Sequence, residues 1–187
     1  MPSRTFLALP LEPDVRARLG QAQRQLNLPG AKIKWMAPEN LHLTVRFLGE
    51  LDDARLAEAC RAAQQAAADC DGFDFDVAGI SAQPAQGPLR MFWAGVIELA
   101  GRLMALREAV DEALGPIGKP DHRPFRPHVT LGRVKKPGDR EALRAAAAER
   151  AAEPFGPNEA AELHVMTSIL TPTGPVYTPA ARCAIGM

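Results

Sequence analysis

Two short segments of this chain contain a histidine and a threonine at the same spacing. Segments 41–45 (Leu-His-Leu-Thr-Val) and 127–131 (Pro-His-Val-Thr-Leu) share the order His, apolar, Thr, apolar, and their histidines are 128 − 42 = 86 residues apart. Imidazoles titrate near neutral pH, so two of them can act as general base and general acid in one reaction. Each such proton transfer is typically worth about 10²–10⁴ in rate.

The alternation within these segments predicts one polar face for each strand, because successive strand residues point to opposite faces. The predicted faces comprise His42, Thr44 and Arg46, and Arg126, His128 and Thr130. A hydroxyl can donate to a non-bridging phosphoryl oxygen, and a guanidinium can clamp such oxygens. Each face therefore suits the transition state of phosphoryl transfer.

Packing and metal binding are the alternative roles for these histidines. A single His-x-Thr on a strand is typical of packing, since threonine is β-branched and suits strands, but the duplication beside basic residues favours catalysis. The histidines of the chain are His42, His122, His128 and His164. No two of them have the i, i+4 spacing that would place both on one face of a helix, and no acidic residue shares the predicted strand face of His42 or His128. We therefore expect no metal and no other cofactor.

Strand and helix patterns alternate along the chain and predict the elements that position these segments. Strands are predicted at 4–9, 32–35, 41–48, 73–80, 90–97, 128–134, 163–170 and 176–185. Helices are predicted from Pro13 to a break at 29–30, and at 53–69, 101–114 and 139–152. Because the strands alternate instead of being continuously apolar, we expect an α+β protein with antiparallel sheets and helices on their outer faces.

Length, charge and cysteines bound the class of protein. A chain of 187 residues is expected to form one domain, 1–187. Its 22 basic and 22 acidic residues leave no net charge, so any RNA contact should be a local basic cleft. Cys60, Cys70 and Cys183 lack a metal-ligand spacing and are expected to be thiols in a reducing compartment. Without a signal-peptide core or a membrane-length apolar segment, the chain is expected to be cytoplasmic, with no membrane contact.

Longer segments around the motifs resemble a known family. The most specific are 39–50 (ENLHLTVRFLGE) and 125–133 (FRPHVTLGR), and shorter ones lie at 4–9, 34–35, 168–170 and 174–177. Together they resemble the two-histidine (2H) phosphoesterase superfamily, and within it the bacterial RNA 2′,3′-cyclic phosphodiesterases, also called 2′-5′ RNA ligases. The resemblance covers nearly the whole chain. It implies a bilobal fold, with two pseudo-symmetric lobes that contain the motifs at 42–45 and 128–131 and flank a central cleft.

The resemblance also implies a reaction, the hydrolysis of a terminal 2′,3′-cyclic phosphate on RNA to a 2′-phosphomonoester. His42 would be the proton donor to the leaving 3′ oxygen and His128 the acceptor that activates water. Thr44 and Thr130 would bind the phosphoryl group. In the reverse reaction an RNA 5′-hydroxyl replaces water and forms a 2′-5′ linkage. The residues alone do not distinguish donor from acceptor, because the two motifs are nearly equivalent.

Further residues are candidates for substrate contacts. Arg126 and Arg46 are predicted to bind the phosphate from the motif faces. The resemblance places Arg133 at the substrate, whereas its odd spacing from His128 turns its side chain away unless the strand bends after Gly132. The aromatic candidates for stacking on a base are Trp35, Phe92 and Tyr177, the last of which also lies in a resembling segment. Phe47, on the predicted core face, and His164 are assigned to structure instead, and His122 is assigned to a solvated loop that could flank the cleft.

Two other functions are compatible with the residues. A protein that binds RNA ends without turnover would keep the fold, although binding does not need two proton carriers. A related enzyme could act on another cyclic phosphate, such as a cyclic nucleotide or an ADP-ribose cyclic phosphate, because the motif recognises phosphate and not the base. The partners expected for the favoured function are RNA ends or nucleoside 2′,3′-cyclic phosphates, and the protein is expected to be a monomer.

Overall fold

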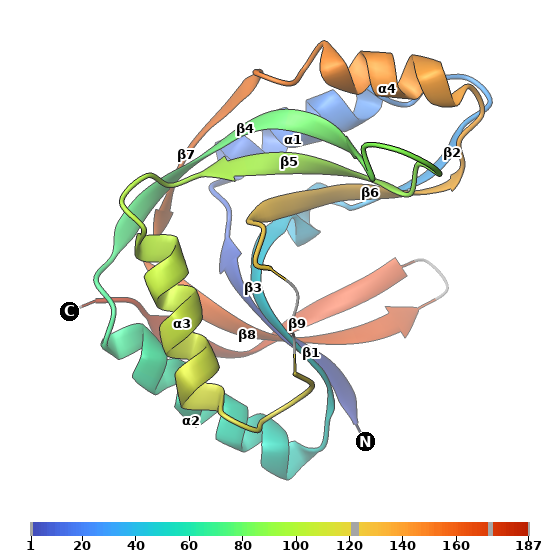
Figure 1. Cartoon of the computed structure of the whole chain (residues 1–187). Helices are drawn as coiled ribbons and strands as arrows, with labels where there is room; N and C mark the ends of the chain where they lie inside the picture. Colours follow the sequence, from blue (N-terminus) through green and yellow to red (C-terminus); the bar gives the residue numbers. More distant parts are fainter. Residues whose placement is uncertain (1, 121–123, 172–173, 187) are drawn as a thin grey trace.

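The computed structural model describes residues 2–120, 124–171 and 174–186, which form one curled antiparallel sheet with helices on its outer side (Figure 1). Its strands are β1 (Ser3–Pro10), β2 (Lys32–Trp35), β3 (His42–Leu51), β4 (Phe73–Gln83), β5 (Met91–Ile97), β6 (His128–Lys136), β7 (Pro154–Ala160), β8 (Glu162–Thr171) and β9 (Gly174–Ala184). The helices are α1 (Pro13–Gln25), α2 (Asp53–Ala68), α3 (Arg102–Leu114) and α4 (Arg140–Ala148), and a 3-10 turn, η1 (Pro38–Asn40), precedes β3. The predicted α+β class with antiparallel strands is confirmed.

The sheet has the same arrangement on either side of its centre. Its order is β7-β4-β5-β6-β3-β1-β8-β9, and β2 pairs with β6 outside this path. The central neighbours are β3 and β6, the two strands that contain the His-x-Thr motifs. We call the strands β1, β3, β8 and β9 the β3 half, and β2, β4, β5, β6 and β7 the β6 half. The motif strands therefore lie at the junction of the two halves.

The helices of the two halves are interleaved along the chain. α1 follows β1 in sequence but packs on β6 and β7, whereas α3 follows β5 and packs on β3. α2 contacts β8 and β9, and α4 contacts β4. Figure 1 shows α2 and α3 together outside the β3 half, and α1 and α4 outside the β6 half. This leaves the concave face of the sheet uncovered by helices.

Local signals set the ends of the helices. Pro13 occupies the first turn of α1. The side chains of Asp52 and Asp139 cap α2 and α4 by accepting hydrogen bonds from the backbone N–H groups of Arg55 (2.8 Å) and Ala142 (3.0 Å). Large buried side chains on the inner helix faces include Val15, Leu19, Leu106, Val110 and Leu143. Burial of one such side chain contributes about 1.5–3 kcal/mol, so this core supports the motif strands from the convex side.

One strand was missed by the sequence patterns. β7 contains Pro154, Gly156 and Pro157, which are typical of a loop. It lies at the edge of the sheet. A proline is tolerated there, because the side that lacks the N–H faces solvent and no hydrogen bond to a neighbouring strand is lost. β3 also continues past Gly49 to Leu51, because Gly49 adopts φ +80° beside an irregularity in the ladder. The other predicted elements lie within four residues of their expected ends.

Candidate active site

β3 and β6 bring the two motifs side by side. The strands are antiparallel, and Leu43 pairs with Val129. In an antiparallel ladder the residues on either side of such a pair also face each other, and they point to the opposite face of the sheet. The opposed residues are His42 with Thr130, and Thr44 with His128. Four polar side chains from distant parts of the chain thus form one group on the concave face.

The imidazole of His42 is held from three sides. Its Nδ1 lies 2.7 Å from the carbonyl oxygen of Asn40, and its Nε2 lies 3.1 Å from Oγ1 of Thr44. Its ring stacks on Phe6, with the centroids 4.9 Å apart. Because a carbonyl only accepts hydrogen bonds, Nδ1 must hold the proton. In the neutral ring Nε2 is then the basic nitrogen, and the hydroxyl of Thr44 donates to it.

His128 has the corresponding environment on the other motif strand. Its Nδ1 lies 2.6 Å from the carbonyl oxygen of Arg126, again two residues upstream, and its ring stacks on Trp93 with the centroids 3.7 Å apart. Phe6 and Trp93 come from β1 and β5, the strands next to β3 and β6. Neither aromatic residue was predicted to lie beside a histidine, because a neighbour across strands is known only once the strand order is known.

Burial lowers the pKa of both histidines. For His42, burial of the ring is the largest cause; the hydrogen bond to the Asn40 carbonyl raises the pKa, and the charge of His128 lowers it. For His128, burial lowers the pKa and the hydrogen bond to the Arg126 carbonyl opposes this. Because His42 senses the charge of His128, protonation of one ring disfavours protonation of the other. As the pH falls, the pair thus passes through a state in which one ring is charged and the other is neutral.

A bulge in β3 reverses two predicted orientations. Thr44 and Arg46 pair with consecutive residues of β1, so Val45 is an extra residue and the alternation shifts by one. Arg46 therefore turns to the helix side, where it is 7% exposed, and Phe47 turns to the concave face, where it is 51% exposed. The prediction that Arg46 shares the face of the motif and binds phosphate there was wrong. The assignment of Phe47 to the core was wrong for the same reason.

Arg46 instead belongs to a charged network with α3. Its Nη1 lies 2.8 Å from Oδ1 of Asp111, whose Oδ2 lies 2.7 Å from Nε of Arg107. Arg107 also donates to the backbone carbonyl of Val45 (2.6 Å), and Arg46 donates to that of Lys119 (3.3 Å). One carboxylate therefore joins two buried guanidinium groups, and the network fixes the bulge of β3 against α3 and the segment after it.

β6 has the equivalent bulge. Thr130 and Gly132 pair with consecutive residues of β5, which leaves Leu131 as the extra residue. Gly132 turns to the core side, where a Cβ would lie 2.6 Å from an indole carbon of β2. Arg133 turns to the concave face and lines the cleft. Arg133 and Phe47 each lie five residues after a motif histidine, so the two bulges are matched. The irregularity that turns Arg133 to the cleft therefore lies at Leu131, before Gly132 and not after it as expected.

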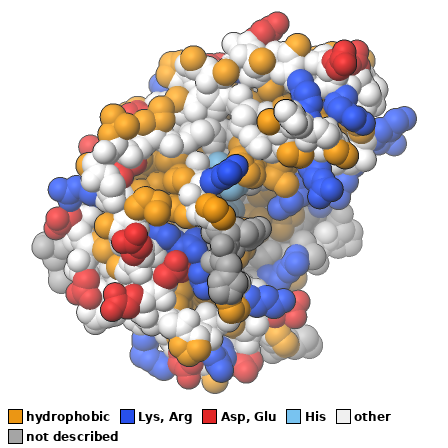
Figure 2. Space-filling model, in the orientation of Figure 1, with side chains coloured by type: hydrophobic (Ala, Val, Ile, Leu, Met, Phe, Trp, Pro, Cys, Tyr) orange, Lys and Arg blue, Asp and Glu red, His pale blue; other side chains and the backbone are white. Residues whose placement is uncertain are grey.

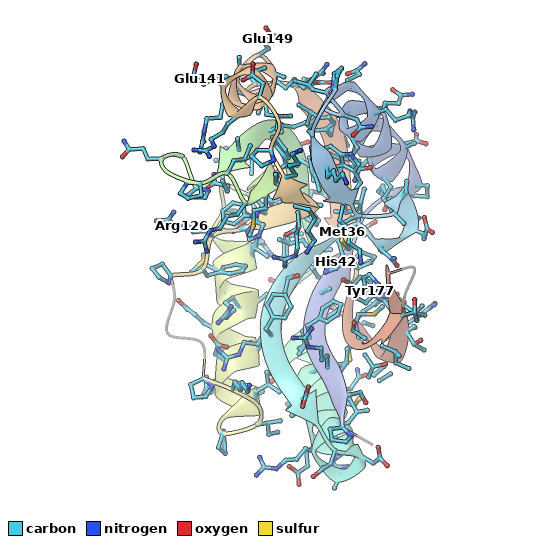
Figure 3. The ribbon with its side chains drawn as sticks, turned by 90° about the vertical axis from the view of Figure 1, so that its right-hand side faces the viewer. Met36, His42, Arg126, Glu141, Glu149 and Tyr177 are labelled. Carbon is cyan, nitrogen blue, oxygen red and sulfur yellow. The ribbon has the colours of Figure 1, made fainter. Side chains whose placement is uncertain are left out.

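The concave face holds a cleft of about 1010 Å³. The predicted site residues in its lining are His42, Thr44, Thr130, Arg133 and Tyr177. His128 and Arg126 are not among the lining residues. Thr44, which lies opposite His128 across the two strands, does line the cleft. Figure 3 shows His42, Met36 and Tyr177 gathered where the two halves of the sheet meet, with Arg126 on the other side of the view. In Figure 2 a histidine is visible between basic and hydrophobic side chains.

Tyr177 approaches the site from β9. Its ring makes edge contacts with His42 (centroids 5.5 Å apart) and with Phe6 (5.1 Å). Burial raises the pKa of the Tyr177 phenol, and the positive charge of Arg133 opposes this. Arg133 belongs to the β6 half and Tyr177 to the β3 half, so their interaction spans the cleft.

The remaining predicted residues lie in different surroundings. Trp35 lines the cleft and stacks on Phe92, with the centroids 5.7 Å apart. Phe92 is fully buried, so the prediction that it stacks on a base was wrong. The side chain of Arg126 is exposed. His164 bonds to a carboxylate of Glu162 on β8 (2.8 Å), and His122 lies outside the described residues.

Other expectations concern metals, thiols and membranes. Within the described ranges, no three His, Cys, Asp or Glu side chains come together as a metal site would need. Cys60, Cys70 and Cys183 are unpaired thiols. None of the helices described is long and apolar enough to span a membrane.

The symmetric curled sheet and its opposed His-x-Thr strands define the class as a two-histidine phosphoesterase. The chain belongs to the LigT-like phosphoesterase family, which matches it over residues 9–93 and 96–177. The family resemblance noted from the sequence is confirmed, and the protein is an enzyme of this class.

Relatives and solved structures agree with this placement. The chain is 30% identical over 178 residues to an RNA 2′,3′-cyclic phosphodiesterase from Methanothermobacter thermautotrophicus, covering 95% of this chain and 96% of the relative. It is 33% identical over 184 residues to a protein of the same name from Thermotoga maritima, covering 96% and 94%. The crystal structure of TT0787 from Thermus thermophilus is similar with a TM-score of 0.79, at 30% identity and 97% coverage of both chains. Escherichia coli LigT complexed with 3′-AMP shares the fold, with a TM-score of 0.77, 24% identity and 99% coverage of both chains.

Proposed function

We propose that this protein hydrolyses the terminal 2′,3′-cyclic phosphate of RNA to a 2′-phosphomonoester, without a metal ion. The observation that carries the proposal is the opposition of the two motifs across β3 and β6. In both histidines a backbone carbonyl holds Nδ1, which leaves Nε2 to exchange a proton with substrate. The names of the relatives, RNA 2′,3′-cyclic phosphodiesterase, support the choice of substrate.

The proposed reaction uses one neutral and one protonated imidazole. Nε2 of neutral His128 removes a proton from water as the water oxygen attacks phosphorus. The bond between phosphorus and O3′ breaks, and Nε2 of protonated His42 gives its proton to O3′. The products are a 3′-hydroxyl and a 2′-phosphate, and one proton exchange with solvent resets the pair. The assignment of donor and acceptor follows the family resemblance, because the two environments are nearly symmetric.

Two threonines and an arginine would stabilise charge on the phosphoryl oxygens. When His42 is protonated, its Nε2 becomes a donor, so the Thr44 hydroxyl no longer has to donate to the ring. Its proton can then turn to a non-bridging oxygen, as can that of Thr130 on the opposed strand. Arg133 would clamp the same oxygens from the β6 half. Side chains thus supply the acid, the base and the positive charge.

The test is to incubate the protein, in excess EDTA, with an RNA oligomer that ends in a 2′,3′-cyclic phosphate. Phosphorus NMR should show a 2′-phosphomonoester as the product. His42→Ala and His128→Ala should each lower the rate by about 10²–10⁴ with unchanged circular dichroism, whereas His164→Ala should retain full activity. A 3′-phosphate product, or full activity in either motif variant, would contradict the proposal.

The same arrangement would join RNA ends when a 5′-hydroxyl takes the place of water, and the new linkage would be 2′-5′. When such a linkage is cleaved, the roles of the two rings exchange, as microscopic reversibility requires. His42 would then remove the proton of the attacking 3′-hydroxyl, and His128 would protonate the leaving 5′ oxygen. At high concentrations of a 2′-5′-joined dinucleotide, the protein should therefore release cyclic phosphate. Its absence while hydrolysis proceeds would limit the proposal to hydrolysis.

We also propose that residues 1–187 act as a single domain, as a monomer in the cytoplasm. The interleaving of α1 and α3 between the two halves of the sheet supports a single folding unit. The three unpaired thiols are compatible with a reducing compartment. Light scattering should give the mass of one chain, and fluorescence and circular dichroism should follow one coincident unfolding transition.

A further inference from the structure

We infer that the exposed surface of β2 and the end of β6 binds the phosphodiester backbone of the RNA that precedes the cyclic end. The inference rests on the proposed function, and it makes the substrate a polynucleotide whose contacts extend beyond its last nucleotide. We call this surface the basic edge. Its residues are Lys32, Lys34, Arg133, Lys135 and Lys136.

The register of the two strands sets like charges directly opposite each other. Lys34 pairs with Arg133, and Lys32 pairs with Lys136. Lys135 is an additional residue at a shift in the register, so it joins the same cluster. Like charges at opposed positions of a ladder destabilise a sheet unless something neutralises them. All five side chains are exposed.

In the described part of the chain, no carboxylate forms an ion pair with this cluster. Among the described residues, the ion pairs involve other arginines and His164, and none includes a residue of the basic edge. By contrast Arg4, a cation at the opposite wall of the cleft, lies opposite Glu50 in the ladder of β1 and β3. Since the whole chain has no net charge, five uncompensated cations on one short stretch of sheet identify a surface suited to a polyanion.

The basic edge is continuous with the cleft. Lys34, Arg133 and Lys135 line the cleft, while Lys32 and Lys136 lie farther along the same two strands. Figure 2 shows basic side chains gathered on the side of the molecule where Figure 1 places β2 and β6. Trp35 is also among the lining residues, but its ring lies on the core side of the sheet, against Phe92. The basic edge therefore contributes cations for the phosphates of a bound strand.

The edge also has a direction. Lys34 and Lys32 are two residues apart on β2, which is roughly 7 Å along the strand. Lys32 lies farther from His42 than Lys34 does, because its partner Lys136 is farther along β6. A chain whose cyclic end lies between the two histidines would therefore leave the cleft along β2 and β6. Its upstream phosphates would meet the two opposed pairs of cations in turn.

Two measurements on the full chain separate this inference from the proposed function. The first is the affinity for a fluorescent octaribonucleotide as a function of salt, which does not depend on turnover. The second is the turnover of a nucleoside 2′,3′-cyclic phosphate, which needs the acid–base pair but not the outer cations. The variant Lys32→Gln with Lys136→Gln removes two outer cations. Arg55→Gln with Arg61→Gln removes the same charge from exposed positions on α2, outside the cleft lining.

The Lys32/Lys136 variant should bind the octamer about tenfold more weakly at low salt. Its plot of log Kd against log salt should be shallower by about 1.4, since a single strand contributes roughly 0.7 per phosphate neutralised. The Arg55/Arg61 variant should match the wild type. Equal affinity and equal salt dependence in all three proteins would overturn the inference. If the octamer binds as expected but no cyclic phosphate is turned over, the basic edge stands and the proposed function fails.

Discussion

The indole of Trp93 lies flat against the imidazole of His128, with the ring centroids 3.7 Å apart and the planes inclined by 19°. Trp93 is opposite Thr130 in the ladder of β5 and β6, so its ring shares the concave face with the motif. Phe6 occupies the corresponding place beside His42, at 4.9 Å. Aromatic contacts of this kind contribute about 0.5–1.5 kcal/mol beyond the buried area. Each motif histidine is therefore oriented by a ring from the neighbouring strand.

Replacement of Trp93 should impair catalysis without removing a reacting group. We expect Trp93→Leu to lower kcat/KM roughly 2- to 10-fold, the equivalent of the stacking energy. The pKa of His128 should rise, because burial by the indole lowers it in the native protein. Histidine NMR titration and steady-state kinetics measure both effects, and Trp93→Phe should recover most of the rate. An unchanged His128 pKa in the leucine variant would exclude this role.

The activity should be greatest below pH 6.5. kcat/KM requires one neutral and one protonated histidine in the free enzyme, and burial lowers the pKa of both His42 and His128 from the ordinary 6.5. The rate should fall at lower pH as the base becomes protonated, and at higher pH as the acid loses its proton. A pH profile with a nucleoside 2′,3′-cyclic phosphate tests this. A maximum above pH 7.5 would be incompatible with the lowered pKa values.

The same pKa values predict how stability depends on pH. Below pH 6.5 the unfolded chain binds protons at His42 and His128 that the folded chain does not yet bind, so the free energy of unfolding falls as the pH drops. Below the folded-state pKa values, this contribution becomes constant. Urea unfolding at pH 5 and pH 8 should show a smaller difference for His42→Gln with His128→Gln than for the wild type. An equal difference in both proteins would show that other groups cause the dependence.

Asp111 should matter for stability more than its partial exposure suggests. Its carboxylate contacts both Arg46 and Arg107, and each arginine is only 7% exposed. Asp111→Ala would leave two buried guanidinium groups without their counter-ion. We expect a loss on the order of 1–3 kcal/mol, reduced from the fully buried case because the carboxylate itself is partly solvated. Urea unfolding measures it, and Glu108→Ala, an exposed change on the same helix, should stay within about 0.5 kcal/mol of the wild type.

Arg133 and Arg46 should differ in their kinetic effects, although each follows a motif closely. Arg133 lines the cleft, so Arg133→Met should raise KM or lower kcat by about tenfold, as expected for the loss of a charge-assisted hydrogen bond. Arg46 points away from the cleft, so Arg46→Met should lower the unfolding midpoint instead, with kinetics near those of the wild type at temperatures where the variant is folded. If the two variants showed the reverse pattern, the bulges would not determine these orientations.

Much of the fold could be predicted because its signals are local. The alternation of apolar and polar residues predicts most strands, and the inner stripe of α3, with Leu103, Leu106, Val110 and Leu114, is buried as its helical spacing requires. The duplicated His-x-Thr pattern predicts a shared chemistry for His42 and His128 because the residue types are themselves the reacting groups. Strand β7 was not predicted, because its prolines are tolerated only at a sheet edge and a sequence pattern does not show which strand is at the edge.

What the sequence by itself determined is the set of chemical groups, the helices, most strands and the α+β class. The tertiary structure decided which groups meet. The pairing of Leu43 with Val129 depends on the strand order, and the orientations of Arg46, Phe47 and Arg133 depend on bulges that each insert one residue into a ladder. A period of two is a property of neighbouring residues, whereas a bulge or a strand order is chosen by the packing of the whole sheet. For the same reason, the contacts of Phe6 and Trp93 with the two histidines were found only in the tertiary structure.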